Sequence, residues 1–202
     1  MLAEFPEASV LEIEEGWEDR WREFHRSVRI GSLWVGPPWE APPADALTVV
    51  IDPGRAFGTG AHPSTRLCLE LLLEEPLGSL LDIGCGSGVI SIAAARLGFD
   101  PVTALDIDQV AVEVTCENAV ANGVRIETLA AADARAGQLP HTDLAVANIS
   151  VEAIEAVAAS VTAPHLITAG YLARDLPELY PFRHAGRRVL DGWGADLFVR
   201  DR

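Results

Sequence analysis

Apolar and polar positions follow one another in blocks between residues 77 and 179. Short apolar runs with the length of buried strands lie near residues 77–83, 101–106, 124–130, 142–148 and 164–170. Runs with helical spacing lie between them, near residues 88–97, 108–122, 151–160 and 173–179. This alternation predicts a parallel sheet covered by helices on both faces, which is a doubly wound α/β fold.

The pattern changes after Pro181. Two extended runs, 183–190 and 195–200, flank the segment Asp191-Gly192-Trp193-Gly194. Extended runs joined by a glycine-rich turn are typical of an antiparallel hairpin. The sequence therefore predicts that a C-terminal hairpin closes the parallel sheet.

The N-terminal part of the chain has a different pattern again. Within residues 1 to about 30, Trp17, Trp21 and Phe24 have helical spacing, which predicts an amphipathic lead-in helix. Prolines between residues 36 and 43 interrupt regular structure, and strand spacing resumes at 47–51. We therefore expect residues 1–45 to form a helical lead-in and Pro-rich linker, and residues 46–202 to form one catalytic domain.

Composition narrows the classes of function. The chain has 202 residues, 49% of them hydrophobic, which is enough for one domain with a substantial core. No run approaches the ~20 apolar residues of a membrane span, and the start lacks the pattern of a leader peptide, so we expect a cytoplasmic protein without a membrane partner. A net charge of −15 disfavours binding to DNA or RNA and favours a basic protein as partner.

The sequence predicts no metal site. Its cysteines, Cys68, Cys85 and Cys116, lack metal-ligand spacing, and its histidines are dispersed. Nucleophilic catalysis by Cys85 would need a neighbouring base, which the sequence does not reveal.

The most informative segment is a glycine-rich turn, Asp82-Ile83-Gly84-Cys85-Gly86-Ser87-Gly88, between a predicted strand and a predicted helix. Its glycines let the backbone turn sharply and approach a ligand, and the N–H groups of the following helix face the turn. Asp106 ends the next predicted strand, 18 residues after Gly88, where an acid can bind ribose hydroxyls. The spacing GxGxG resembles motif I of the class I S-adenosylmethionine-dependent methyltransferases, which implies S-adenosylmethionine as the cofactor.

A second segment rich in glycine and hydroxyl groups precedes this turn. It spans residues 52–65 and reads Asp-Pro-Gly-Arg-Ala-Phe-Gly-Thr-Gly-Ala-His-Pro-Ser-Thr. Gly58 and Gly60 permit close approach to a ligand, and Ser64 or Thr65 is expected to cap a helix over residues 66–75. The alternative interpretation is a capping loop without ligand contacts.

Together the two segments resemble the ribosomal protein L11 methyltransferase family, whose members carry an Asp-Pro-Gly-x-Ala-Phe-Gly-Thr-Gly-x-His-x-[Ser/Thr]-Thr loop ahead of the glycine-rich turn. The similarity covers nearly the whole chain from Trp17. It continues through Asp106-Ile107-Asp108, Glu117-Asn118-Ala119, Asn122-Gly123-Val124, Ala147-Asn148-Ile149 and Ala169-Gly170-Tyr171-Leu172. The resemblance implies a seven-stranded, Rossmann-like methyltransferase fold and methylation of a protein.

The resemblance also implies roles for the matching residues. The methionine end of the cofactor and the acceptor mouth would be lined by Phe57, Gly58, Thr59, Gly60, His62 and Thr65. The backbone of the cofactor would be held by Asp82, Gly84, Gly86 and Gly88, its ribose by Asp106, and its adenine by Ile107 and Asp133.

Asn148 would face the methyl acceptor from the end of the fourth strand. Its side-chain oxygen can accept a hydrogen bond from an amine and align the nitrogen lone pair with the methyl group, so it belongs with the cofactor-binding and catalytic residues. Enzymes that methylate adenine or glutamine amides typically have Asn-Pro-Pro-Tyr here, whereas this chain has Asn148-Ile149-Ser150-Val151. We therefore predict transfer to a lysine or N-terminal amine, with Asn148 and His62 as catalytic residues.

Two features depart from the family pattern. Members usually carry a substrate-recognition domain before the Trp17 region, where this sequence has sixteen residues, so we expect a short form without that domain. Ser150-Val151-Glu152 also stands where the family commonly has Leu and a Pro-containing turn. The expected acceptor is a ribosomal protein or another basic protein. The alternatives are a small-molecule N-methyltransferase and a non-catalytic module that binds S-adenosylmethionine.

Overall fold

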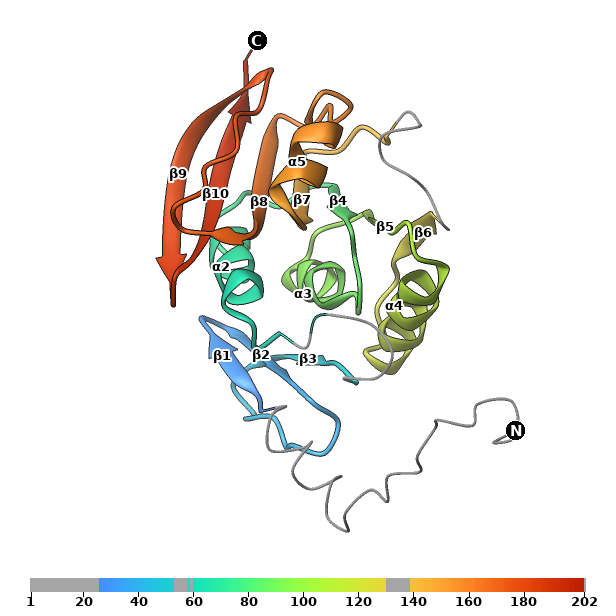
Figure 1. Cartoon of the computed structure of the whole chain (residues 1–202). Helices are drawn as coiled ribbons and strands as arrows, with labels where there is room; N and C mark the ends of the chain where they lie inside the picture. The colour runs from blue at the N-terminus through green and yellow to red at the C-terminus, as the bar shows by residue number, and fades with distance from the viewer. Residues whose placement is uncertain (1–25, 53–57, 59, 130–138, 202) are drawn as a thin grey trace, which may run out of the picture.

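A seven-stranded sheet forms the centre of the molecule in the computed structural model, which describes residues 26–52, 58, 60–129 and 139–201 (Figure 1). In chain order its strands are β4 Leu80–Ile83, β5 Val102–Leu105, β6 Glu127–Leu129, β7 Leu144–Asn148, β8 His165–Leu172, β9 Phe182–Leu190 and β10 Trp193–Arg200. They lie side by side in the order β6-β5-β4-β7-β8-β10-β9. The first five strands of this order are parallel, and β10 is antiparallel to both of its neighbours.

Helices cover both faces of this sheet. They are α2 Pro63–Leu72, α3 Val89–Leu97, α4 Gln109–Ala121 and α5 Val151–Ala158. The α2 and α3 helices share one buried core with the sheet, and α5 packs on the opposite face. Successive strand residues enter opposite cores, as Leu80 and Leu81 do, which explains why the strands are continuous apolar runs in the sequence. The predicted doubly wound α/β fold with a C-terminal antiparallel hairpin is therefore confirmed.

A small second sheet packs under α3 (Figure 1). Its strands are β1 Val28–Ile30, β2 Leu33–Gly36 and β3 Leu47–Val50. The β2 strand pairs in parallel with β3, so the sheet joins residues on both sides of position 45. Its buried side chains, among them Leu33 and Val49, belong to the core that α2 and α3 share with the large sheet.

The predicted lead-in helix is wrong in its last residues. Residues 28–30 form β1, because Gly31, with a φ of 55°, allows a tight turn that pairs Ile30 with Leu33. The aromatic stripe of Trp17, Trp21 and Phe24 lies outside the described residues.

The predicted helix over residues 173–179 is also wrong. This segment has no regular structure, and Pro177 within it lacks the N–H that a helix needs. Its backbone groups form hydrogen bonds to the C-terminal hairpin instead. The Ala173 N–H donates to the Gly192 carbonyl at 2.8 Å, and the Asp175 carbonyl accepts from the Arg187 guanidinium at 2.5 Å. Tertiary contacts therefore replace the helix that the local spacing predicted.

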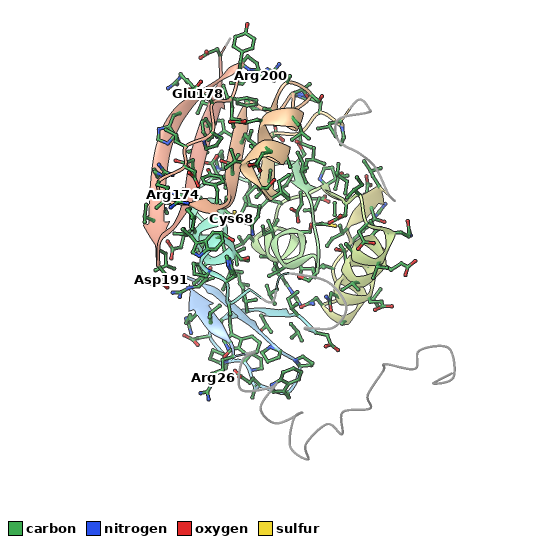
Figure 2. All side chains as sticks on the ribbon, in the orientation of Figure 1. Arg26, Cys68, Arg174, Glu178, Asp191 and Arg200 are labelled. Carbon is green, nitrogen blue, oxygen red and sulfur yellow. The ribbon has the colours of Figure 1, made fainter. Side chains whose placement is uncertain are left out.

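The C-terminal hairpin turns more tightly than predicted. Asp191 and Gly192 alone connect the strands, both with positive φ, which is the conformation of a two-residue hairpin turn. Figure 2 places Asp191 at the end of the hairpin that lies nearest the small sheet. Trp193 consequently begins β10 instead of lying in the turn, and its ring contacts the site described below. Among the described helices, none is long and apolar enough to cross a membrane.

Candidate active site

Predicted site residues from the described part of the chain meet at one edge of the large sheet. The parallel strands β4, β5 and β7 end side by side at Ile83, Leu105 and Asn148. The glycine-rich turn follows β4, and Asp106 follows β5. In open α/β sheets ligands bind at this carboxyl edge, so the fold brings the predicted residues to the expected place.

Hydrogen bonds join the two glycine-containing segments to each other. The Ser87 hydroxyl, in the glycine-rich turn, donates to the carbonyl of Gly58 in the upstream segment. Asn118 on α4 binds both segments, because its Nδ2 donates to the Ser87 carbonyl at 2.9 Å and its Oδ1 accepts from Asp52 N–H at 3.4 Å. One turn later, Asn122 binds both the N–H and the carbonyl of Val50, at 2.8 and 2.6 Å.

The sequence reasoning gave no role to these two asparagines beyond their place in the family pattern. Asn118 on α4 and Asn122, the C-cap residue of α4, lie four residues apart, and both are buried. Two amides four residues apart within a predicted helix are a signal for a buried polar contact. They hold the site together but need not contact a ligand.

Asp106 braces the glycine-rich turn. Its Oδ2 accepts from the Gly86 N–H, and its Oδ1 accepts from the Asp108 N–H, both at 3.0 Å. The N–H groups of Gly84 and Cys85 donate to the Leu105 carbonyl at the end of β5. Hydrogen bonds therefore join the turn to Asp106, the residue predicted to bind the ribose. Next to it, Ile107 is 65% exposed, and an exposed apolar side chain fits the predicted contact with an adenine ring.

The three glycines of the turn all have positive φ, and at Gly84 a close approach adds to this requirement. A Cβ on Gly84, whose φ is 78°, would overlap the side chain of Ile149. Ile149 follows the predicted acceptor residue Asn148 directly. This contact between β4 and β7 was not predicted, because the sequence does not show which side chain of the β7 turn faces the glycines.

Asp82 carries a buried carboxylate, and only one of its two oxygens has hydrogen-bond partners among the described residues. Its side chain is 1% exposed, and Oδ2 accepts from the Ser91 N–H at 3.1 Å and from the Ser91 hydroxyl at 2.6 Å. Its Oδ1 is buried and has no hydrogen-bond partner among the described residues. Burial raises the pKa of Asp82 to about 6. A ligand with an ammonium group would supply the missing donor and favour the charged form.

Asn148 is oriented by a hydroxyl from α2. Its Nδ2 donates to Thr65 Oγ1 at 3.2 Å, and Thr65 is 1% exposed. Because the amide nitrogen is engaged with Thr65, the side-chain oxygen is the atom turned away from it and able to accept from a ligand. The structure thus brings together two predicted site residues that are 83 positions apart.

His62 caps α2, so the prediction of Ser64 or Thr65 as the cap is wrong. His62 Nδ1 accepts from the Ser64 N–H at 3.3 Å and lies 2.8 Å from the Ser64 hydroxyl oxygen. The helix begins earlier than predicted because Pro63 suits its first position. Edge-to-face contact with Trp193, at 4.4 Å between ring centroids, joins this cap to the C-terminal hairpin. Burial lowers the pKa of His62, which favours the neutral ring at neutral pH.

The thiol of Cys85 is unsuited to nucleophilic catalysis. Burial raises its pKa to about 12, and the Thr115 hydroxyl donates to its sulfur at 3.2 Å. Across the described part of the chain, no group of three or more metal-ligating side chains comes together. The predicted residues Phe57, Thr59 and Asp133 lie outside the described residues, and the ligand roles of all the site residues remain predictions.

Comparison with known proteins identifies the same family that the sequence motifs resemble. The family model described as ribosomal protein L11 methyltransferase (PrmA) matches residues 4–174. A ribosomal protein L11 methyltransferase of Legionella pneumophila (strain Lens) is 37% identical over 200 residues, which cover 92% of this chain and 69% of the relative. One of Myxococcus xanthus (strain DK1622) is 35% identical over 214 residues, covering 99% of this chain and 74% of the relative.

A solved structure is similar over most of the chain. It is the ribosomal protein L11 methylase of Lactobacillus delbrueckii subsp. bulgaricus, with a TM-score of 0.75 and 26% sequence identity. The similarity covers 88% of this chain and 100% of that chain. The sheet order, the place of the glycine-rich turn at the carboxyl edge and the similar proteins therefore all indicate the same fold.

Proposed function

The chain belongs to the ribosomal protein L11 methyltransferase family, and from this premise we propose that it methylates a lysine or N-terminal amine of a basic protein such as a ribosomal protein. Membership makes it an S-adenosylmethionine-dependent methyltransferase. The observation that supports an amine acceptor is the orientation of Asn148. Its amide nitrogen donates to Thr65, which leaves its oxygen able to accept a hydrogen bond from an amine. A ribosomal acceptor would place the enzyme in the cytoplasm.

The residues at the carboxyl edge of the sheet fit the cofactor. We assign the ammonium group of its methionine part to the unpaired Oδ1 of Asp82, because a buried carboxylate oxygen without a donor needs one. The ribose hydroxyls would bind Asp106, and the adenine would lie against Ile107. When bound, S-adenosylmethionine supplies a methyl group that its positively charged sulfur already activates.

Methyl transfer then needs alignment more than acid–base catalysis. A deprotonated amine would donate an N–H to Asn148 Oδ1, which directs the nitrogen lone pair toward the methyl carbon. Bound S-adenosylmethionine would supply the methyl group with its sulfur as the leaving group, and the methylated amine would release its extra proton to solvent. Asn148 would therefore act by orienting the acceptor.

His62 would form the acceptor side of the site together with Trp193. Because Nδ1 accepts the Ser64 N–H, the neutral ring carries its proton on Nε2 and can donate but not accept there. We therefore assign His62 a role in contacting the acceptor and not that of a general base. The face of Trp193 would suit the positive charge of a methylated amine product.

A radiolabelled transfer assay tests the proposed function directly. The purified chain is incubated with tritium-labelled S-adenosylmethionine and an extract of the source organism, and labelled products are identified by mass spectrometry. The proposal expects label in basic proteins, at lysine side chains or N-termini. Label confined to metabolites would instead make the chain a small-molecule N-methyltransferase. Cofactor binding without any transfer would make it a non-catalytic binding module.

The buried carboxylate of Asp82 predicts a pH-dependent affinity for the cofactor. Because only the charged form can pair with the ammonium group, the affinity should rise about tenfold from about pH 5 to about pH 7, centred on the pKa of about 6. In the free protein the raised pKa of Asp82 has the opposite effect on stability, which falls as the pH rises. It adds stability below about pH 4, and this stability is lost as the pH rises through about 6.

Calorimetric titration with S-adenosylmethionine across this range measures the effect. Asp82→Asn is the matched control, since it keeps the shape and the Ser91 bonds but does not titrate. Its affinity should be low and flat with pH. An equally steep pH dependence in this variant would assign the titration to another group and contradict the role of Asp82.

A further inference from the structure

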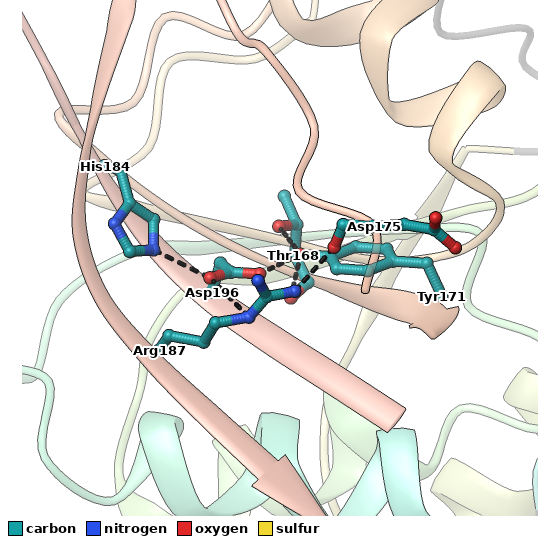
Figure 3. A network of polar contacts seen from close by, with 6 residues as sticks. All are labelled: Thr168, Tyr171, Asp175, His184, Arg187 and Asp196. Carbon is teal, nitrogen blue, oxygen red and sulfur yellow. Dashed lines mark hydrogen bonds and ion pairs between the residues drawn. The ribbon is translucent and has the colours of Figure 1, made fainter. Parts of the chain in front are cut away.

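A buried polar network lies beside the Asn148 edge, on strands β8, β9 and β10 (Figure 3). At its centre is Asp196, whose side chain is fully buried. Asp196 Oδ2 accepts from the Tyr171 hydroxyl at 2.7 Å, and Oδ1 lies 2.7 Å from His184 Nε2 and 3.4 Å from Arg187 Nε. The Tyr171 oxygen also lies 2.7 Å from Thr168 Oγ1.

An extra residue in β8 brings Tyr171 into this network. Ala169 and Tyr171 pair with consecutive residues of β10, so Gly170 between them has no partner on that strand. Gly170 has a φ of 100°, a backbone conformation that favours glycine. Such a bulge reverses the side-chain alternation, and it turns Tyr171 onto the face of the sheet that carries Asp196.

The same bulge touches the turn that follows Asn148. Ala169 pairs with Asn148 across β7 and β8. A Cβ on Gly170 would overlap the carbonyl oxygen of Ile149 and lie 2.9 Å from the Ile149 nitrogen and carbonyl carbon. Ile149 in turn lies over Gly84 of the cofactor turn. Ile149, which directly follows Asn148, is therefore held between the β8 bulge and the glycine-rich turn.

The network fixes the bulge rigidly. Burial raises the pKa of Tyr171, so its hydroxyl stays protonated and donates to Asp196. The buried charge of Asp196 is balanced by Arg187, which also donates to the Asp175 carbonyl and so holds the segment after β8. A buried carboxylate that is bonded from both neighbouring strands in this way favours one backbone position over others.

We propose that Tyr171 is a positioning residue for methyl transfer. By tying the bulge at Gly170 to Asp196, it fixes Ile149 and through it the direction of the Asn148 amide. The proposal rests on the proposed function in one respect, which is that Asn148 faces the acceptor. Tyr171 itself needs no contact with cofactor or acceptor.

Paired phenylalanine variants test the proposal. Tyr171→Phe and His184→Phe each keep an aromatic ring and each remove one donor to Asp196, but only Tyr171 lies on the bulge. Tyr171→Phe should lower kcat on the order of tenfold while the Kd for S-adenosylmethionine stays within about twofold, because small misplacement of an orienting group affects the reaction more than binding. His184→Phe should leave kcat within about twofold. Equal kcat values in the two variants, or a parallel loss of cofactor affinity in Tyr171→Phe, would overturn the proposal.

A second measurement works without activity. In protein labelled with ¹⁵N at asparagine, the side-chain amide signals of Asn148, assigned by their loss in Asn148→Ala, should move in Tyr171→Phe and stay in place in His184→Phe. Unmoved signals in both variants overturn the positioning role. If wild type methylates no protein, the proposed function fails, and these signals still decide the present inference.

A milder variant covers the case in which Tyr171→Phe does not fold. Thr168→Val removes the hydroxyl beside the Tyr171 oxygen and leaves the bond between Tyr171 and Asp196. It should shift the Asn148 amide signals in the same direction by a smaller amount and lower kcat about threefold. Unchanged signals and an unchanged kcat in Thr168→Val count against the proposal.

Discussion

Replacing Asn148 by alanine is expected to lower kcat on the order of 100-fold while the Kd for S-adenosylmethionine changes less than about threefold. The reason is that, in the proposed function, the amide oxygen orients the acceptor nitrogen and is not the main anchor of the cofactor. Its orientation comes from the bond between Nδ2 and Thr65 Oγ1. Steady-state methyl transfer to a labelled protein, together with calorimetric cofactor binding, separates the two quantities.

Asn148→Asp serves as the control for this prediction. It keeps an oxygen that can accept from the amine and can itself accept from the Thr65 hydroxyl, so it should retain more turnover than the alanine variant. The reverse pattern, with cofactor affinity lost and kcat kept in Asn148→Ala, would mean that Asn148 binds the cofactor and does not orient the acceptor.

Replacing Gly84 by alanine is expected to reduce the affinity for S-adenosylmethionine by about 100-fold or more. Two costs combine there. The φ of 78° costs an L-residue about 1–2 kcal/mol, and the new methyl group overlaps the Ile149 side chain, so the turn must move away from the cofactor-binding position. Calorimetric titration of the folded variant measures the loss.

Gly192→Ala is a matched control for the backbone cost. Gly192 has a φ of 80°, nearly that of Gly84, but a Cβ there would meet nothing within 4 Å. This variant should lose some thermal stability and keep wild-type cofactor affinity. If Gly84→Ala binds as tightly as Gly192→Ala, the contact with Ile149 does not shape the cofactor turn.

The elements whose place in the fold was predicted correctly are those whose pattern is local in the chain. Alternating apolar and helical runs specify the parallel sheet, because each run must be buried on the faces that its own spacing dictates. The turn from Asp82 to Gly88 and the carboxylate of Asp106 follow their strands directly, so their place at the carboxyl edge follows from the strand order.

Local spacing was misleading where tertiary contacts compete with it. The spacing of segment 173–179 predicted a helix, yet its backbone bonds to Gly192 and Arg187 of the hairpin instead. The cap of α2 is His62 and not a hydroxyl residue, because Pro63 suits the first position of the helix and so places the first turn earlier. In the first case partners distant in the sequence decided the local structure, and in the second case the neighbouring proline did.

The sequence by itself determined the fold class, the family and the edge of the sheet at which the proposed cofactor site lies, since these depend on periodicity and on contiguous motifs. Only the tertiary structure decided which atoms face one another. It set Thr65 against Asn148, wedged Ile149 between Gly84 and Gly170, and turned Tyr171 toward Asp196 through a one-residue bulge. The physical reason is that these contacts depend on strand register and on side-chain direction, which a single inserted residue reverses without changing the hydrophobic pattern.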